Sequence, residues 1–368
     1  MSGFDVPIVL MVFNRPQQTA RAFDVVRAVQ PATLLLVADG PRVDHPDDVA
    51  RCEAVRAIVD DVDWPCTVVR DFSDDNLGCD RRIVTGLDRV FSVVDRAIVL
   101  EDDIVAHPSF FPWCAAMLDR YADAPDVLHV SGRNDLGRYG PPGAEHLLVR
   151  RGSGNGWATW AEAWQAVDPT LGTAPHDLDA TIDRVDELAL DPLVRSHLLR
   201  LVDAAASGAL GAWDCTWWAS CVLVDGWAVV PPVNLVHNCG YGPDANRTTN
   251  ADDFRAFLPV GVVPAPADTE PSPRPAPDPS YDRSSLLVDL MATYTRPETV
   301  ARLARSRHVL ARVDGPIDAD LLHHLAPFDH VDESLAALAH LRAAGLDHPQ
   351  LDALEAALRA SVAQKAGA

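Results

Sequence analysis

The sequence is poor in positive charge, and in lysine above all. Lys365 is the only lysine, and 31 lysines and arginines together face 53 acidic residues, which gives a formal net charge of −22 at pH 7. Because a nucleic acid or an anionic membrane needs a basic face, this balance argues against both as main partners. It is compatible with one small anionic ligand held in a local basic pocket.

Paired cysteines and long apolar runs are also missing. The cysteines are seven in number, and none stands in a C-x-x-C spacing, so we expect reduced thiols. The longest early apolar stretch, residues 7–13, is far below the roughly 20 residues of a membrane span. No cleavable leader pattern precedes it. We therefore expect a soluble, cytoplasmic protein without a membrane span.

Four short apolar runs in the first hundred residues alternate with amphipathic segments of helical spacing. Continuously apolar runs of this length are typical of strands covered on both faces. Strands separated by such helices form βαβ units, so the pattern predicts an α/β fold with an open sheet flanked by helices. Ligands bind such sheets outside the carboxyl ends of the strands. The four runs are residues 7–13, 34–38, 66–69 and 97–100.

Proline divides the rest of the chain. Prolines crowd together between Pro259 and Pro279, a density that no helix or central strand tolerates. We predict a main domain at residues 1–258, an extended segment at 259–283 and a small helical region at 284–368. The sequence of that last region indicates no chemistry, and a homo-oligomer held by its helices is one hypothesis.

The sharpest local signal is the acidic triplet Glu101, Asp102 and Asp103, which directly follows the fourth apolar run. Three adjacent carboxylates repel one another, and a divalent cation would relieve the cost of burying them. Mg²⁺ or Mn²⁺ favours carboxylates together with phosphate oxygens. The alternative is a solvated acidic loop, which is common in so acidic a chain.

Polar residues also end the first two apolar runs. Asn14 and Arg15 follow the first, and Asp39 and Gly40 follow the second, so both pairs should share a sheet edge with the acidic triplet. An arginine beside a helix start suits a diphosphate, and an aspartate suits a ribose hydroxyl or a base N–H. A surface arginine and a turn aspartate remain the simpler alternatives.

These motifs resemble those of the GT-A glycosyltransferases. The similarity is closest to the branch with the Golgi N-acetylglucosaminyltransferase that begins complex N-glycans, and to its bacterial relatives. It covers about residues 5–250. This range includes the tryptophan- and glycine-rich stretch around Trp157 and the pair Trp213-Asp214. The segments that carry it are Phe13-Asn-Arg-Pro16, Asp39-Gly-Pro41, Asn76-Leu-Gly78, Val99-Leu-Glu-Asp-Asp-Ile104 and Val130-Ser-Gly-Arg-Asn-Asp135.

The resemblance implies a GT-A fold and an inverting, metal-dependent transfer of a hexosyl or N-acetylhexosaminyl group. The donor would be a nucleoside-diphosphate sugar, with uridine diphosphate favoured, and the acceptor a hydroxyl. Asp103 in its DXD-like motif would bind Mn²⁺ or Mg²⁺, and Asp214 would be the catalytic base. Helix N-capping is the alternative for Asp214. The implied donor contacts are Asn14, Arg15, Asp39, Gly40, Glu101 and Asp102.

The acceptor side is less well marked. Tryptophan is usually buried in cores, and a lone histidine near a strand is usually structural, so both types have a plain alternative. The Golgi members of the family carry a membrane anchor, which we do not expect here, and the loop after Gly242 matches the family pattern only in part. The candidates on this side are Arg133, Asn134, Asp135, Trp157 and His237.

Two other functions fit parts of the pattern. A sugar nucleotidyltransferase would need a glycine-rich basic loop after its first strand, which Phe13-Asn-Arg-Pro16 does not provide. A catalytically silent nucleotide-sugar-binding or scaffold protein would keep the same fold. The glycine run at residues 152–156 opens no βα turn after a first strand, which excludes a nicotinamide-binding fingerprint.

Overall fold

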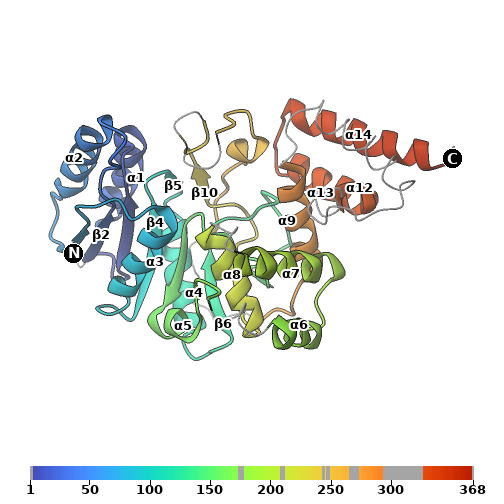
Figure 1. Ribbon diagram of the computed structural model, residues 1–368, viewed down its shortest axis with the longest axis horizontal. Helices are drawn as coiled ribbons and strands as arrows, with labels where there is room; N and C mark the ends of the chain where they lie inside the picture. Colours follow the sequence, from blue (N-terminus) through green and yellow to red (C-terminus); the bar gives the residue numbers. More distant parts are fainter. Residues whose placement is uncertain are drawn as a thin grey trace.

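The computed structural model describes residues 3–172, 178–207, 212–242, 245, 249–264, 273–292 and 326–366. Its centre is an eight-stranded mixed sheet in the order β3-β2-β1-β4-β8-β6-β9-β7 (Figure 1). The α/β prediction is therefore confirmed. From the N-terminus to residue 160, the elements are β1 (Ile8–Val12), α1 (Pro16–Val29), β2 (Thr33–Ala38), α2 (Asp47–Asp60), β3 (Thr67–Phe72), α3 (Cys79–Val90), β4 (Arg96–Glu101), β5 (Ile104–Ala106), α4 (Phe110–Arg120), β6 (Val127–Ser131), β7 (Leu147–Val149) and β8 (Trp157–Trp160).

Strand directions bring several loops to one rim of the sheet. Strands β1, β2, β3 and β4 are mutually parallel. Strand β8 is antiparallel to both β4 and β6, so β6 runs in the same direction as β4. The carboxyl ends of β1, β2, β4 and β6 therefore point to the same rim, where α/β sheets bind ligands.

Helices cover both faces of the sheet because alternate strand residues point to opposite sides. Ile8 and Leu10 of β1 pack with α1, α2 and α4 on one face. Val9 and Met11 pack on the other face with α3, α5 (Ala161–Ala166) and α8 (Trp213–Leu223). All five residues of β1 are buried, as its apolar run predicts.

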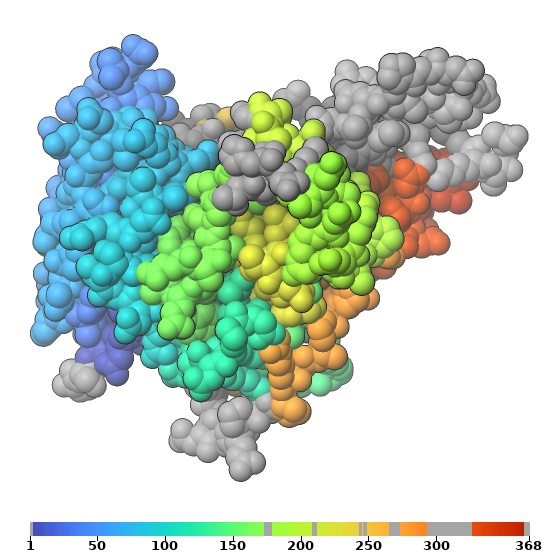
Figure 2. All heavy atoms as spheres, turned by 60° about the horizontal axis from the view of Figure 1, so that its bottom comes forward, coloured from blue at the N-terminus to red at the C-terminus, as the bar shows by residue number. Residues whose placement is uncertain are grey.

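A second part of the molecule is built on the β7 edge of the sheet. Its buried cluster joins residues of β7 and β9 to those of the late helices, so the helices share this core with the sheet. In the space-filling view, the green, yellow and orange segments of the chain lie against each other, beside the blue N-terminal part (Figure 2). The remaining elements are α6 (Leu178–Glu187), α7 (Pro192–Ala206), β9 (Trp227–Val230), β10 (Val236–Asn238), η2 (Phe254–Phe257), α9 (Pro279–Ala292), α12 (Ala326–Asp329), α13 (Val331–Ala343) and α14 (Pro349–Ala366).

Helix α9 begins earlier than the sequence predicts. The expected extended segment ends at residue 283, but α9 starts at Pro279. Proline is favoured in the first turn of a helix, where its missing N–H is not needed. The carboxylate of Asp278 accepts hydrogen bonds from the backbone N–H groups of Ser280 and Tyr281, both at 3.1 Å, and so caps the helix. Residues 265–272 and 293–325 of the two predicted C-terminal regions lie outside the described residues.

No disulfide forms among the seven cysteines, all of which lie in the described part of the chain. Within the described part of the chain, no helix has the combination of length and apolarity that crossing a bilayer requires. The division into a main domain, an extended segment and a helical region stays a prediction.

Candidate active site

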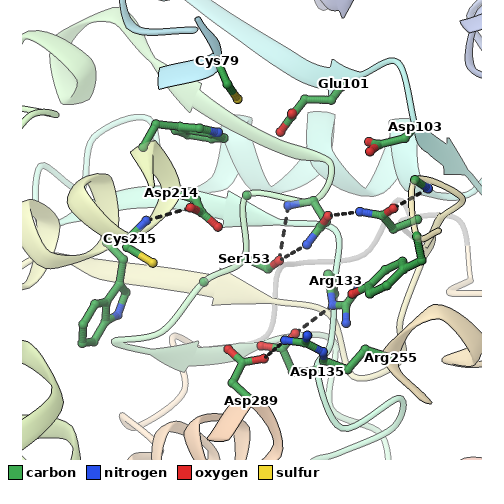
Figure 3. A pocket seen from close by; sticks show the side chains of 18 of the residues that line it. Cys79, Glu101, Asp103, Arg133, Asp135, Ser153, Asp214, Cys215, Arg255 and Asp289 are labelled. Carbon is green, nitrogen blue, oxygen red and sulfur yellow. Dashed lines mark hydrogen bonds and ion pairs between the residues drawn. The ribbon is translucent and has the colours of Figure 1, made fainter. Parts of the chain in front are cut away.

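Two adjoining cavities open at the rim where β1, β2 and β4 end. The larger has a volume of about 270 Å³ and the smaller one of about 250 Å³. Arg15, Cys79 and Glu101 line both of them, so these residues mark the junction. Figure 3 looks into the larger cavity, with Glu101 and Asp103 on one wall and Asp214 on another.

The acidic triplet is organised by one arginine. Arg15 follows β1, and its Nη2 pairs with Asp102 and lies 3.0 Å from Oδ2 of Asp103. Asp102 is buried, and its other oxygen accepts a hydrogen bond of 3.3 Å from the backbone N–H of Phe13. Asp102 thus joins the ends of β1 and β4, while Glu101 and Asp103 line the larger cavity.

Negative charge dominates this wall despite the arginine. The pKa of Glu101 is held well above its usual range, chiefly by burial and then by Asp103 and Asp214. Burial also raises the pKa of Asp102 to about 6, against the opposing pull of Arg15. Burial and the neighbouring carboxylates thus both oppose ionisation of this wall, and a bound cation would act in the opposite direction.

The oxygens on this wall are of the kind that Mg²⁺ and Mn²⁺ bind. In the parts of the chain that the structure describes, no three or more histidine, cysteine or acidic residues form a complete metal cage. Mg²⁺ commonly uses only one or two carboxylates and takes its other ligands from water and substrate phosphates. Asp103 and Glu101 therefore fit a metal that is shared with a phosphorylated ligand.

A glycine permits the close approach at Asp103. Strand β10 pairs with β5, and the backbone N–H of Cys239 donates to the carbonyl of Asp103 at 2.8 Å. A Cβ atom on the next residue, Gly240, would lie 2.0 Å from Oδ2 of Asp103 and 2.9 Å from Nη1 of Arg15. Any larger residue at position 240 would displace this pair.

Asp39 organises the wall of the smaller cavity. Its carboxylate accepts hydrogen bonds from the backbone N–H groups of Leu77 and Gly78, at 2.9 and 3.1 Å, and from Nδ2 of Asn76 at 3.0 Å. These bonds fix the loop that leads into α3. The side chain of Asp39 lines the cavity, as the sequence predicts for a nucleotide contact.

Asn14 and Gly40 support this wall from behind. Nδ2 of Asn14 donates to Asp48 at 2.7 Å, and Asp48 in turn pairs with Arg42, which lines the smaller cavity. A Cβ on Gly40 would come within 2.5 Å of the backbone of Asp75, so only glycine fits this contact. Both residues lie outside the lining of the two cavities, and the donor contact expected of them stays a prediction.

Asp214 lies in the first turn of α8 and faces the larger cavity. The helix begins after Ala212, so Asp214 is not the cap residue. Its Oδ1 accepts from the backbone N–H of Cys215 at 3.0 Å. The N–H of Trp213 donates to Asp80 at 2.8 Å, which ties this turn to the start of α3.

The tryptophans beside Asp214 pack into the core and leave its side chain open to solvent. Trp213 and Trp217 are buried in the core beneath the helix, whereas the side chain of Asp214 is exposed. Trp157 is also part of this core, with no exposed surface, and its ring stacks on that of His129 at 5.1 Å between centroids. Trp157 thus lies outside the lining of both cavities, and its predicted acceptor contact is not found.

The other acceptor-side candidates divide into two groups. Arg133 and Asp135 line the larger cavity and are joined by a bond of 2.8 Å from Nε to Oδ1. Asn134 is fully buried, and its Nδ2 donates to the carbonyl of Pro231 at 2.8 Å, which is a structural role. His237 is exposed on β10 and lies outside the lining of both cavities.

Several lining residues were not anticipated. The glycine run at residues 152–156 forms part of the wall, where a Cβ on Gly154 would lie 3.1 Å from the ring of Trp213. Helix α9 contributes Asp289, so part of the predicted C-terminal helical region lines the cavity. The glycine run was the only local signal of close packing here. The residues missed are Ser153, Asn155, Arg151, Asn238, Arg255 and Asp289.

Three solved structures are similar to the protein at low identity. The mannosyltransferase PcManGT from Pyrobaculum calidifontis, in complex with GDP-Man and Mn²⁺, is 12% identical, with a TM-score of 0.38 over 98% of this chain and 86% of that one. A UDP-glucose pyrophosphorylase complexed with UDP-glucose is 8% identical, with a TM-score of 0.32 over 64% and 93%. The apo form of mouse xyloside xylosyltransferase 1 is 14% identical, with a TM-score of 0.30 over 60% and 82%.

No protein-family model and no curated protein matches the sequence. Similarities of this strength do not identify an activity. The function has to be argued from the residues that line the two cavities.

Proposed function

We propose that the protein is a metal-dependent glycosyltransferase that moves a sugar from a nucleoside-diphosphate donor to an acceptor hydroxyl. One observation carries the proposal: Arg15, Glu101, Asp103 and Asp214 line a single cavity that adjoins a second one. The first three suit a diphosphate and its cation, and the fourth is a carboxylate on another wall. This is the set of charges that such a transfer uses.

The donor spans the two cavities in this proposal. Its nucleoside occupies the smaller one, whose lining combines Asp39 and Arg42 with apolar side chains such as Val37. Its diphosphate lies at the junction, where Arg15 and Glu101 line both cavities. Arg15 provides a planar donor fork that suits phosphate oxygens. The motif resemblance favours uridine as the base.

Asp103 is the proposed ligand of Mn²⁺ or Mg²⁺, with Glu101 beside it. A bound divalent cation would neutralise the charge that develops on the leaving diphosphate. Arg15 adds a second positive charge to the same region, and Asp102 holds that arginine in place. The acids and the arginine together set the position of the diphosphate.

Asp214 is the proposed general base. An inverting transfer needs a base that removes the proton of the acceptor hydroxyl on the side opposite the leaving group. Asp214 and Asp103 approach the cavity from different walls, which leaves space between them for the transferred sugar (Figure 3). The exposure of Asp214 gives an acceptor direct access to it.

A donor panel tests this proposal. UDP- and GDP-sugars are incubated with the protein, with Mn²⁺ or with EDTA, and nucleotide release is measured. We expect release from one donor class only with the metal. Release that is indifferent to EDTA would contradict the metal role. Binding of UDP and Mn²⁺ without turnover of any donor would instead favour the silent binding protein.

Two variants separate the proposed roles. Asp103→Asn should weaken binding of UDP with Mn²⁺ in calorimetry and abolish metal-dependent release. Asp214→Asn should keep that binding but lower kcat by about 10²–10⁴-fold, the usual contribution of a general base. Asp203→Asn, on the exposed surface of α7, is the matched control and should change neither. Retention of anomeric configuration in the product would contradict inversion.

A further inference from the structure

Three arginines meet at the end of the larger cavity that lies away from the acidic triplet. Arg133 follows β6, Arg151 follows β7, and Arg255 belongs to η2. Figure 3 places Arg133 and Arg255 beside Asp135 and Asp289, on the side opposite Glu101 and Asp103. Convergence of three guanidinium groups from three separate elements is unexpected in a chain with a net charge of −22.

Two of these arginines are neutralised within the wall. Arg151 and Arg255 both pair with Asp289 of α9, and Nη1 of Arg255 lies 3.2 Å from Oδ1 of that aspartate. Arg255 also binds Asp253, with 2.7 Å between Nη2 and Oδ2. Their positive charges are thus largely matched by neighbouring carboxylates.

Arg133 differs from the other two. Arg133 is only 4% exposed, yet it lines the cavity. Its Nε donates to Oδ1 of Asp135 at 2.8 Å, and its two terminal nitrogens have no hydrogen-bond partner among the residues that the structure describes. Neither nitrogen is among the sealed side-chain atoms without a partner in the described residues, so both are accessible from the cavity that Arg133 lines. They can therefore donate to a ligand in that cavity.

Asp135 fixes the direction of that guanidinium. Its second oxygen, Oδ2, accepts from Oγ of Ser285 at 2.8 Å, and its backbone N–H donates to the hydroxyl of Tyr281 at 3.1 Å. Both partners belong to α9. Because Asp135 is held from both sides and engages only Nε, the edge of Arg133 that carries Nη1 and Nη2 stays available to a ligand.

We propose that this end of the cavity, defined here as the arginine subsite of Arg133, Arg151 and Arg255, binds an oxyanion carried by the acceptor. The group is a carboxylate, a phosphate or a sulfate, because such oxygens match the two parallel donors of a guanidinium. The assignment to the acceptor rests on the proposed function, whereas the oxyanion site itself does not.

The charges of the cavity favour the acceptor as the source of this group. The donor diphosphate belongs at the junction with the smaller cavity, beside Arg15. An anionic substituent would be repelled by Glu101 and Asp103, whereas the open Nη1–Nη2 edge of Arg133 can donate two hydrogen bonds to it. Asp214 lines the same cavity, so an acceptor held by its anionic end can present a hydroxyl to that base.

Inorganic sulfate and phosphate test the subsite directly. Their binding is measured by calorimetry at constant ionic strength, with UDP and Mn²⁺ present to fill the donor site. Wild type should bind them saturably, and Arg133→Gln should weaken binding at least tenfold. Arg138→Gln removes an exposed arginine of the same loop and should have no effect. Absence of saturable binding to wild type, or equal binding by Arg133→Gln, would overturn the proposal.

Loss of Arg133 leaves Asp135 without its partner, so folding has to be controlled. Arg133→Lys keeps the charge but not the planar fork, and should bind sulfate with an affinity between those of wild type and Arg133→Gln. Binding of UDP with Mn²⁺ should be unchanged in every variant. If Arg133→Gln also loses the binding of UDP with Mn²⁺, the sulfate affinity of Arg133→Lys is used for the test instead. A sulfate affinity of Arg133→Lys equal to that of wild type would then contradict the subsite.

Matched acceptors locate the source of the oxyanion. With the donor found in the panel, glucose, glucuronate and glucose 6-phosphate are compared as acceptors. We expect kcat/KM at least tenfold higher for the two anionic sugars, and no such preference in Arg133→Gln. If the protein prefers UDP-glucuronate to UDP-glucose and shows no preference among the acceptors, the bound oxyanion belongs to the donor and not to the acceptor. If no donor is turned over, the proposed function fails, and sulfate binding still decides the subsite.

Discussion

Arg15 is the only positive side chain that contacts both Asp102 and Asp103 among the residues that the structure describes. Its side chain is 11% exposed, so the pairs it makes are largely buried. Removing one partner of a buried ion pair costs about 3–5 kcal/mol because the remaining charge is left uncompensated. We predict a loss of this size in the free energy of unfolding for Arg15→Gln at pH 8.

The loss should depend on pH in a defined direction. The pKa of Asp102 is already raised to about 6 by burial while Arg15 is present, so without the arginine it rises further. At pH 5 the carboxyl of Asp102 is protonated in the folded variant, so this residue no longer leaves an unpaired charge. The difference between wild type and Arg15→Gln should therefore shrink markedly from pH 8 to pH 5.

Mn²⁺ without nucleotide provides the decisive comparison. In wild type, Arg15 occupies oxygens of Asp102 and Asp103, and so competes with a cation at this wall. In Arg15→Gln the same oxygens are unpaired, and a cation restores the missing charge. Mn²⁺ should therefore stabilise Arg15→Gln more than wild type; at a hundredfold excess over its Kd the gain is about 2.7 kcal/mol.

Urea unfolding followed by tryptophan fluorescence measures these differences, with Mn²⁺ or EDTA at each pH. Arg70→Gln is the control, because Arg70 makes an exposed ion pair with Asp60, and such pairs contribute about 0–1 kcal/mol. Equal stability of Arg15→Gln and wild type at pH 8 would refute the electrostatic reasoning. Equal stabilisation of both proteins by Mn²⁺ would refute the competition between arginine and cation.

Three further predictions concern one residue of the cavity wall and two buried residues behind it. Gly240→Ala places a methyl group against Asp103 and should lower kcat/KM for nucleotide release by roughly 100-fold, the cost of a misplacement near 1 Å; unchanged kinetics would contradict the close contact. Burial lowers the pKa of His129 from 6.5 to about 4, so its stabilising contribution is complete above pH 6.5 and is lost as the pH falls toward 4. His129→Gln should flatten the pH dependence of unfolding in that window by up to about 1.4 kcal/mol per pH unit, and an unchanged slope would argue against a buried neutral histidine. Tyr281→Phe strands the buried N–H of Asp135 and should cost about 2 kcal/mol in urea unfolding, with weaker sulfate binding; a neutral effect would contradict the role of this hydroxyl.

The first half of the fold was predictable because its signals are local. The apolar runs of β1, β2 and β4 are each continuous, and parallel strands share a rim, so proximity of Arg15 to Asp103 follows from the chain order. The register confirms the arrangement, since Met11 of β1 lies opposite Glu101 of β4. The positions of Arg15 and Asp103 could therefore be predicted without knowledge of any distant segment.

The second half was not predictable in this way. Strand β7 has three residues and β8 four, too few for a periodic signal. The position of β8 between β4 and β6 depends on tertiary packing, and it is what aligns β6 with the rim and brings Arg133 to the cavity. Asn14 was placed on the correct rim, but its partner Asp48 lies in a helix that no local rule connects to it.

The C-terminal helices illustrate why composition alone misjudged part of the site. Helix α9 holds two loops at once: Asp282 accepts from the backbone N–H groups of Arg150 and Arg151, at 3.0 and 2.8 Å, while Ser285 and Tyr281 bind Asp135. These contacts span 131 to 150 residues of sequence. Because Tyr281, Asp282 and Ser285 anchor these loops, α9 forms part of the cavity's wall. Without α9, Asp135 would lose both of these contacts, and the direction of Arg133 would no longer be fixed.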